Sequence, residues 1–194
     1  VSEELFATPL SSAIVRYRVT VLDPDTGAGI IEMVDNAQTL YAVRSSHGTL
    51  QNYILEHNPE ITVQELRMRI ARSYAVYGVL SFILALGDRH LENIMTTPEA
   101  KLFHIDYSYM LGTNPAPRTA LLSMNTSTSR SSGTPSSSRR NVRITPGIVE
   151  AMGGKDSEFY RSFCDMSGKV YNMLRRRHKE LYSLIRPLVV PVNR

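Results

Sequence analysis

The chain has 194 residues, of which 42% are hydrophobic and 21% charged, enough to build the core of one compact domain. This composition excludes a disordered tail. The single cysteine, Cys164, excludes an internal disulfide and any zinc site made of several cysteines, and it fits a reducing cytosol. The net charge of +4 suits an anionic partner such as a phosphate, a lipid headgroup or a nucleic acid, without choosing among them.

The N-terminal sequence VSEELFATPL has no basic stretch followed by an apolar stretch, so we expect no secretory signal. No apolar run reaches the roughly 18 residues that a membrane-spanning helix needs. The chain begins with Val1 instead of Met, and we expect it to be processed or cut from a longer polypeptide.

Residues 14–35 are predicted to form a β-hairpin. Apolar and polar residues alternate in VRYRVTV, which is the two-residue period of a half-buried strand and places Val19 and Val21 on its buried face. The turn sequence DPDTGAG follows, and GIIEMVD is the second apolar run. Residues 37–44 are predicted to be a short helix or turn.

A long helix is predicted to begin at Thr62, because Thr62 and Glu65 form the pattern of a capping box. Apolar residues then recur at helical spacing from Leu66 to Leu84, and we expect the helix to end at Gly87.

Two short apolar pieces, in NIM and KLFHI, flank the turn sequence TTPEA and predict a second hairpin. Residues 116–143 are poor in apolar residues and rich in Ser, Thr and Arg, as in TSTSRSSGTPSSSRR, and predict a mobile loop.

The C-terminal part is predicted to be helical. Thr145 suits a helix cap and Pro146 the first turn, and the glycines at 153–154 end this helix. Two further helical patterns, near 157–174 and 178–186, complete a mostly α-helical body.

Asp88, Asn93 and Asp106 form a pattern that suits phosphate chemistry. Asp88 and Asn93 are five residues apart, which is the offset between the catalytic Asp and the metal-binding Asn of a kinase loop. Asp106 follows the next predicted strand, where a kinase keeps a second metal-binding acid. Mg²⁺ needs hard oxygen ligands, while a separate carboxylate faces the attacking hydroxyl, so the spacing predicts phosphoryl transfer.

Each of these groups also has a purely structural interpretation. An Asp–Arg pair at a helix end is usually a surface ion pair, and a lone histidine such as His90 or His104 is more often packed than catalytic. Arg139 and Arg140 have the ordinary interpretation of solvated charges.

The sequence LGDRHLENIM followed by LFHIDY resembles the catalytic and metal-binding loops of the phosphatidylinositol 3- and 4-kinase family, whose pattern is GDRHxxN and then HIDFG. The order D-R-H distinguishes that family from ordinary protein kinases. GIIEMV resembles the family's hinge, and YMLGTNPAP and VEAMGGKDSEFYRSFC are most similar to class III phosphatidylinositol 3-kinase.

The resemblance implies an α+β fold, mostly α, of the protein-kinase-like C-lobe with the hinge and the last N-lobe strands. Residues 1–35 are expected to be the end of the N-lobe and the hinge, and residues 36–194 the C-lobe. Within the C-lobe we expect the catalytic loop at 86–95, the metal loop at 104–109 and the activation loop at 107–146. The rest of the N-lobe, with its glycine-rich loop and lysine, is expected to be missing, so the isolated chain is expected to be inactive.

The resemblance also implies site residues. Asp88 is expected to orient or deprotonate the inositol hydroxyl, with His90 as the alternative base or as a stabiliser of phosphate charge. Asn93 and Asp106 are expected to hold Mg²⁺, or Mn²⁺ in its place, against the phosphates of ATP. Adenine is expected to contact Glu32, Val34, Met95 and Ile105. The lipid headgroup is expected to meet the basic residues Arg118, Arg139, Arg140 and Arg143.

The function implied is transfer of the ATP γ-phosphate to the 3-hydroxyl of phosphatidylinositol. The expected partners are phosphatidylinositol in membranes, a regulatory subunit and the missing N-lobe in cis or in trans, without nucleic acid. The expected location is cytoplasmic, peripheral at endosomal or autophagic membranes.

Two alternatives stay open. A phosphatidylinositol-kinase-like protein Ser/Thr kinase shares D-R-H-x-x-N, although MGGKDSEFY favours a lipid kinase. A non-catalytic binding module is favoured by the lack of any lysine before Lys101 and by Tyr107 and Ser108, which replace the family's Phe and Gly. Ser in place of Gly restricts the backbone at the base of the loop.

Overall fold

The computed structural model describes residues 10–111 and 143–189. In chain order, the elements are η1 (Leu10–Ala13), β1 (Val19–Asp23), β2 (Ala28–Ile31), β3 (Gln38–Thr39), α2 (Leu40–His47), α3 (Leu50–His57), α4 (Val63–Ile83), β4 (Ile94–Thr96), β5 (Leu102–His104), α6 (Pro146–Ala151), α7 (Glu158–Arg176) and α8 (His178–Val189). The fold is therefore α+β and mostly helical, as predicted.

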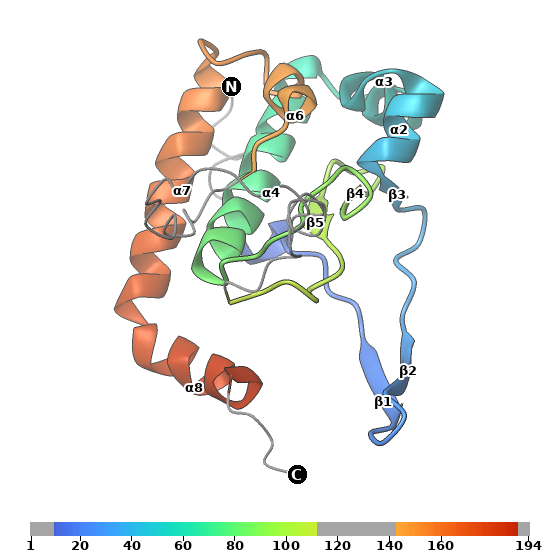
Figure 1. The fold of residues 1–194 in the computed structure, drawn as a ribbon. Helices are drawn as coiled ribbons and strands as arrows, with labels where there is room; N and C mark the ends of the chain where they lie inside the picture. The colour runs from blue at the N-terminus through green and yellow to red at the C-terminus, as the bar shows by residue number, and fades with distance from the viewer. Residues whose placement is uncertain (1–9, 112–142, 190–194) are drawn as a thin grey trace, which may run out of the picture.

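Helix α4 lies at the centre of the molecule, with α7 on one side and the small sheet β3–β4–β5 on the other (Figure 1). Because it is covered on several sides, its buried residues are distributed around the helix instead of along one stripe. Leu66, Ile70 and Tyr74 of α4 join Phe163 of α7 and Leu102 of β5 in the main core. The acid-rich loops leave from the end of this buried helix and from the strands beside it.

Hydroxyl side chains begin five of the helices. In each case the hydroxyl oxygen accepts a hydrogen bond from the amide three residues later, which satisfies one of the unpaired amides of the first turn. The capping residues are Thr39, Thr49, Thr62, Thr145 and Ser157. The caps predicted at Thr62 and Thr145 are confirmed, while the helix that begins after Thr49 was not predicted.

Two details of the predicted long helix differ in the structure. The hydroxyl of Thr62 caps the helix by accepting a hydrogen bond from the amide of Glu65. The side chain of Glu65, which the capping-box pattern assigned to the cap, pairs with Arg69 at 2.6 Å. The helix ends at Ile83 instead of Gly87. The chain leaves the helix early because Ala85 adopts a left-handed backbone conformation, with φ of 44°.

Both predicted hairpins form. Strands β1 and β2 pair antiparallel, with Val19 opposite Ile31, and β4 and β5 pair antiparallel, with Ile94 opposite His104. Strand β3 joins the outer side of β4, so the second hairpin becomes a three-stranded sheet in the order β3–β4–β5.

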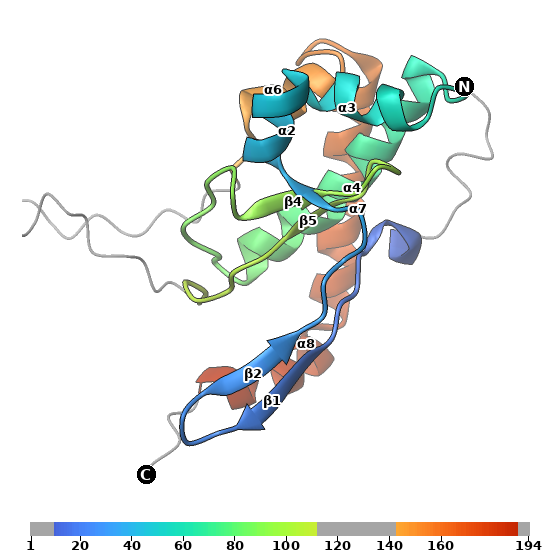
Figure 2. The ribbon, with the colours of Figure 1, turned by 90° about the vertical axis from the view of Figure 1, so that its right-hand side faces the viewer.

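The burial predicted for the first hairpin is wrong. Val19 and Val21 are 60% and 64% exposed, and Ile30 and Ile31 of the other strand are 58% and 63% exposed. Figure 2 shows the reason: β1 and β2 extend away from the helical body, so neither face of the hairpin rests on that body. The alternating pattern correctly predicted a strand, but in the described part of the chain no other segment covers its apolar side chains.

The predicted mobile segment lies almost wholly outside the described residues, as do Arg118, Arg139 and Arg140. In the two described stretches, no helix has both the length and the apolar character that crossing a bilayer requires.

The hydroxyl of Ser73 attaches the free edge of β5 to α4. It donates to the carbonyl of Leu102 at 2.9 Å and accepts from the amide of Leu102 at 2.8 Å. We predict that Ser73→Ala lowers the free energy of unfolding by about 2 kcal/mol, because both buried groups lose their partner. Urea unfolding measures this.

The matched control is Ser183→Ala, whose hydroxyl bonds to Lys179 on the exposed surface of α8. We expect it to change stability by less than about 0.5 kcal/mol. Equal losses in the two variants would show that Ser73 does not fasten the strand.

Candidate active site

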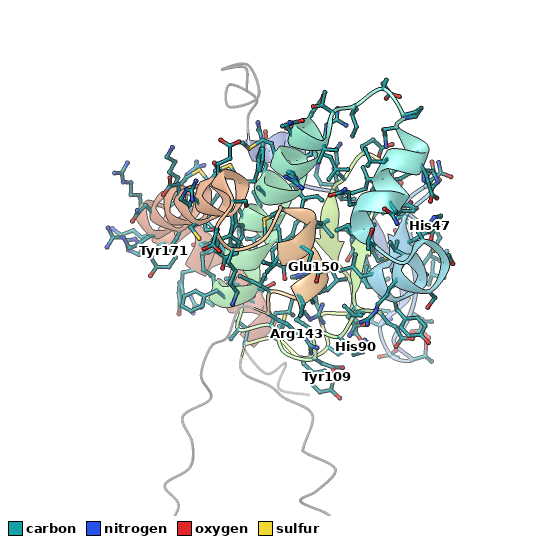
Figure 3. The ribbon with its side chains drawn as sticks, turned by 90° about the horizontal axis from the view of Figure 1, so that it is seen from above. His47, His90, Tyr109, Arg143, Glu150 and Tyr171 are labelled. Atoms are coloured by element: carbon teal, nitrogen blue, oxygen red, sulfur yellow. The ribbon has the colours of Figure 1, made fainter. Side chains whose placement is uncertain are left out.

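Two loops make up the candidate site, one between α4 and β4 and one after β5. They run side by side, because Gly87 donates its amide to the carbonyl of Tyr109 and Leu111 donates to that of Leu84, each at 2.6 Å. Figure 3 shows His90 and Tyr109 on the same side of the molecule, away from Tyr171 on α7. The predicted catalytic and metal loops are therefore neighbours in space.

Arg89 joins the two loops from inside. The residue is only 6% exposed, and its guanidinium donates to four backbone carbonyls. Nε donates to Gly87 at 2.8 Å, and Nη1 to Asn93 at 3.3 Å and Ile105 at 2.6 Å. Nη2 donates to Asp106. One buried cation thus fixes the first loop against the second.

The two aspartates of the site adopt unusual backbone conformations. Asp88 has φ of 50° and Asp106 has φ of 56°, in the left-handed region that costs energy for residues other than glycine. The carbonyl of Asp88 accepts from Nδ2 of Asn93 at 2.9 Å, and the carbonyl of Asp106 accepts from Arg89. These bonds hold the two acids in conformations that the free chain avoids.

His90 lies beside the carboxylate of Asp88, with 3.8 Å between Nε2 and Oδ2. The amide of Glu92 donates to Nδ1 of His90 at 3.2 Å. Nδ1 also lies 3.7 Å from Oε2 of Glu92, so each ring nitrogen of His90 faces a carboxylate. Both side chains are partly exposed, so a substrate hydroxyl has access to them.

Asn93 and Asp106 offer oxygen atoms that fit a hard metal ion. Because Nδ2 of Asn93 is bonded to Asp88, the amide keeps Oδ1 for a ligand. Hydrogen bonds from the side chain and the backbone of Ser108 lower the pKa of Asp106 and keep it ionised. An amide oxygen and a carboxylate are ligands that Mg²⁺ accepts, with phosphates and water completing its octahedron.

No cluster of three or more His, Cys, Asp or Glu residues suited to a metal occurs among residues 10–111 and 143–189.

Two of the four predicted adenine residues lie at the second sheet, and the other two lie in the segment between β2 and β3. Met95 lies on β4 and Ile105 directly after β5, both half-buried. Glu32 and Val34 follow β2, and the chain then reaches β4 through β3, which pairs Thr39 with Met95. Glu32 is exposed and Val34 half-buried.

The replacement of glycine by Ser108 does not strain the backbone. Asp106 and Leu111 have positive φ in this loop, but Ser108 does not. The serine instead donates its amide to Oδ1 of Asp106 at 3.0 Å. The residue expected to restrict the loop therefore supports the acid.

His104 matches the structural interpretation of a packed histidine. It is 3% exposed, its Nδ1 lies 2.8 Å from the hydroxyl of Ser81, and its Nε2 is buried without a hydrogen-bond partner. Burial, with a smaller contribution from the charge of Arg89, lowers its pKa to about 4.

Arg89 is the residue of the site that sequence reasoning missed. Its motif suggested a surface ion pair, but the side chain is buried and bonds to carbonyls instead of carboxylates. The available signal was its position between Asp88 and His90, one residue from a predicted catalytic acid.

Comparison with known proteins identifies the family to which the chain belongs. The family model described as phosphatidylinositol 3- and 4-kinase matches residues 1–190. The chain therefore belongs to this family.

Several curated phosphatidylinositol 3-kinases are similar to the chain. Phosphatidylinositol 3-kinase VPS34 of Arabidopsis thaliana is 28% identical over 181 residues, covering 90% of this chain and 19% of the relative. Phosphatidylinositol 3-kinase VPS34 of Saccharomyces cerevisiae is 31% identical over 165 residues, covering 82% and 16%. Phosphatidylinositol 3-kinase 1 of Dictyostelium discoideum is 29% identical over 172 residues, covering 83% and 10%. The chain thus spans a fifth or less of the length of these relatives.

The Arg89 network generates a prediction about stability. We expect Arg89→Met to lower the free energy of unfolding by about 3 kcal/mol, because hydrogen bonds from a charged donor each contribute about 1.5 to 3 kcal/mol and do not add fully. The free energy of unfolding of Arg89→Lys should lie between those of Arg89→Met and the original protein, since lysine keeps the charge but loses the planar, multiple donors of the guanidinium. Urea unfolding and amide exchange at Ile105 measure the effect. Unchanged exchange at Ile105 in Arg89→Met would contradict it.

His104 generates a prediction about pH. The unfolded chain takes up a proton on this histidine near pH 6.5, whereas the folded chain does so only near pH 4. Acidification from 6.5 towards 4 therefore favours the unfolded state, by up to about 3 kcal/mol, and the stabilisation is complete above 6.5. In urea unfolding at several pH values, His104→Gln should flatten this dependence. His178→Gln, at an exposed position, is the control, and a slope equal to the original protein's in both variants would exclude His104 as the cause.

Proposed function

We propose that this chain is part of a lipid kinase that transfers the γ-phosphate of ATP to the 3-hydroxyl of phosphatidylinositol. Membership of the family supports phosphoryl transfer, and the relatives named phosphatidylinositol 3-kinase support the 3-position. The observation that carries the proposal is the Arg89 network, because it holds the loop of Asp88 and Asn93 against the loop of Asp106.

Asp88 and His90 are proposed to act on the attacking hydroxyl. A carboxylate that accepts the hydroxyl proton both orients the oxygen and increases its nucleophilicity. His90 lies close enough to share this proton, or to carry positive charge towards the transferred phosphate. In either case the histidine and the aspartate act as a pair, so their substitutions should not be additive.

Asn93 and Asp106 are proposed to hold Mg²⁺, or Mn²⁺ in its place, through Oδ1 and the carboxylate. The bound ion supplies neutralisation of the phosphate charge. The chain contributes to this step in two ways: Ser108 keeps Asp106 ionised, and the carbonyl of Asp88 orients the amide of Asn93. Because both ligands are fixed before the nucleotide arrives, little reorganisation accompanies binding.

Adenine is proposed to bind between Glu32 and Val34 on one side and Met95 and Ile105 on the other. The first pair offers a backbone carbonyl and amide to the edge of the base, and the second pair offers apolar contact to its face. The half-buried positions of Met95 and Ile105 support this assignment.

Residues 1–35 are proposed to be the end of a kinase N-lobe and the hinge, with residues 36–194 as the C-lobe. The exposed apolar residues of β1 and β2 support this division, because large apolar areas on a hairpin favour contact with a further body. We propose that the remainder of an N-lobe, in cis or in trans, covers them.

The substrate side of the proposal concerns the loop at 107–146. Arg118, Arg139 and Arg140 lie outside the described residues, and Arg143 lies inside them, exposed before α6. Basic residues at this place suit an anionic headgroup. We propose that the protein works in the cytoplasm at endosomal or autophagic membranes, with a regulatory subunit and without nucleic acid.

The experiment is a radiometric assay on the protein at its natural length, with phosphatidylinositol vesicles and labelled ATP. Chromatography of the deacylated product should give the 3-phosphate. A 4-phosphate product would overturn the positional assignment. Labelled protein without labelled lipid would support a protein kinase, and ATP binding without any transfer would support a binding module.

Asp106 provides the sharpest variant. We predict that Asp106→Asn lowers turnover by at least about 100-fold without loss of the fold, because it removes the charge that balances the phosphates. The control is Asp165→Asn, the same change at an exposed position on α7. Circular dichroism checks the fold in both. Near-normal lipid phosphorylation by Asp106→Asn would remove this acid from the mechanism.

A further inference from the structure

A cavity of about 600 Å³ lies between helices α2 and α3 on one side and α6 on the other. The three helices lie next to one another at one end of the molecule in Figures 1 and 2. Its lining includes neither Asp88, Asn93 nor Asp106, although Leu91 of the catalytic loop and Arg143 of the proposed substrate loop belong to it. Its volume falls within the range of about 300 to 1,000 Å³ that is common for small-molecule sites.

Apolar side chains form much of the cavity wall. Leu91 of the catalytic loop and Ile144 before α6 line it with partly buried side chains, and both pack against the main core. Pro146 at the start of α6 adds an exposed apolar surface, while Val43, Leu50 and Ile148 border the cavity but are only 1%, 6% and 0% exposed. Because Leu91 and Ile144 pack against the core, this part of the wall is preformed and suits an apolar body.

Two cations line the same cavity from different segments. Arg44 comes from α2 and Arg143 from the residues directly before α6. Neither forms an ion pair with another residue in the described stretches. Among the described residues of the lining, Glu150 of α6, labelled with Arg143 in Figure 3, is the one carboxylate, so their positive charge exceeds their negative charge.

We propose that this cavity binds a small amphipathic anion, with a phosphate or carboxylate head between Arg44 and Arg143 and an apolar body against Leu91, Ile144 and Pro146. Arginine suits this role because its planar donors match both oxyanions. A purely polar ion leaves the apolar wall unused, and a neutral apolar ligand leaves both exposed cations paired only with water. A ligand that satisfies both the apolar residues and the two arginines carries an apolar group and an anionic group.

The cavity also shares a wall with the catalytic loop. Tyr41 of α2 donates its amide to the carbonyl of Leu91 at 3.1 Å, and Leu91 directly follows His90. A ligand that contacts Leu91 therefore reaches the loop that carries Asp88 and His90. Binding at the cavity does not depend on the proposed kinase function, whereas an effect on turnover does.

The test uses three probes below their micelle concentrations: octyl phosphate, octyl glucoside and inorganic phosphate. Calorimetry and amide NMR are carried out on the full chain. We expect octyl phosphate to bind at least about tenfold more tightly than either other probe, since each lacks one of the two kinds of contact. The shifted amides should include Leu50, Leu91 and Ile148. Comparable binding of inorganic phosphate would assign the site to free phosphate and overturn the amphipathic ligand.

Arg44→Gln tests the charge without touching Arg143, which the substrate proposal also uses. It should reduce the preference for octyl phosphate over octyl glucoside to about threefold or less. The matched control is Arg18→Gln, the same change on the exposed hairpin, and it should leave the preference unchanged. Equal effects of the two changes, or NMR shifts confined to the hairpin, would mean that the alkyl chain binds the exposed strands and would overturn the proposal.

Gly147→Phe tests the volume. A Cβ atom at Gly147 meets no other atom within 4 Å, so a side chain can start there without displacing the backbone. Since Gly147 lines the cavity, the phenyl ring should weaken both octyl probes by at least about fivefold, in proportion to the apolar contact that it takes. Unchanged binding in a folded Gly147→Phe protein would place the ligand elsewhere.

Discussion

The guanidinium of Arg89 is the interaction on which the candidate site depends. A buried cation requires partners, and here the partners are four carbonyls on two separate loops instead of a carboxylate. Carbonyls compensate the charge only partly, and burial lowers the pKa of the guanidinium, with the nearby Asp106 acting in the opposite direction. The same arrangement leaves the carboxylates of Asp88 and Asp106 free for other charges. An arginine paired directly with either acid would have neutralised it.

The left-handed backbones of Asp88 and Asp106 follow from the same arrangement. A chain that is free to relax would leave these conformations, so they persist because the surrounding bonds specify them. The support is layered: α4 and the sheet hold the loops, Arg89 holds the loops to each other, and Asn93 and Ser108 set the two acids. Rigidity of this kind suits a site whose task is to present charge at fixed places.

Local patterns in the sequence predicted much of this fold. The caps at Thr62 and Thr145 and the two hairpins depend on residues close together in the chain, and these predictions are confirmed. The exposure of Val19 and the burial of Arg89 were not predictable in this way, because both depend on which distant segments lie beside them. The spacing of Asp88, Asn93 and Asp106 predicted neighbouring loops, and the structure brings those loops together, while their roles in catalysis stay predictions.

The exposed hairpin has a consequence for how the chain associates with other molecules. Strands β1 and β2 each have one edge unpaired within their two-stranded sheet, and their side chains are largely apolar. Until another surface covers it, such a hairpin is a site for chaperone binding and for strand addition between copies. In this chain the hairpin is therefore the described region most open to strand addition, because its free edges and its exposed apolar side chains belong to the same two strands.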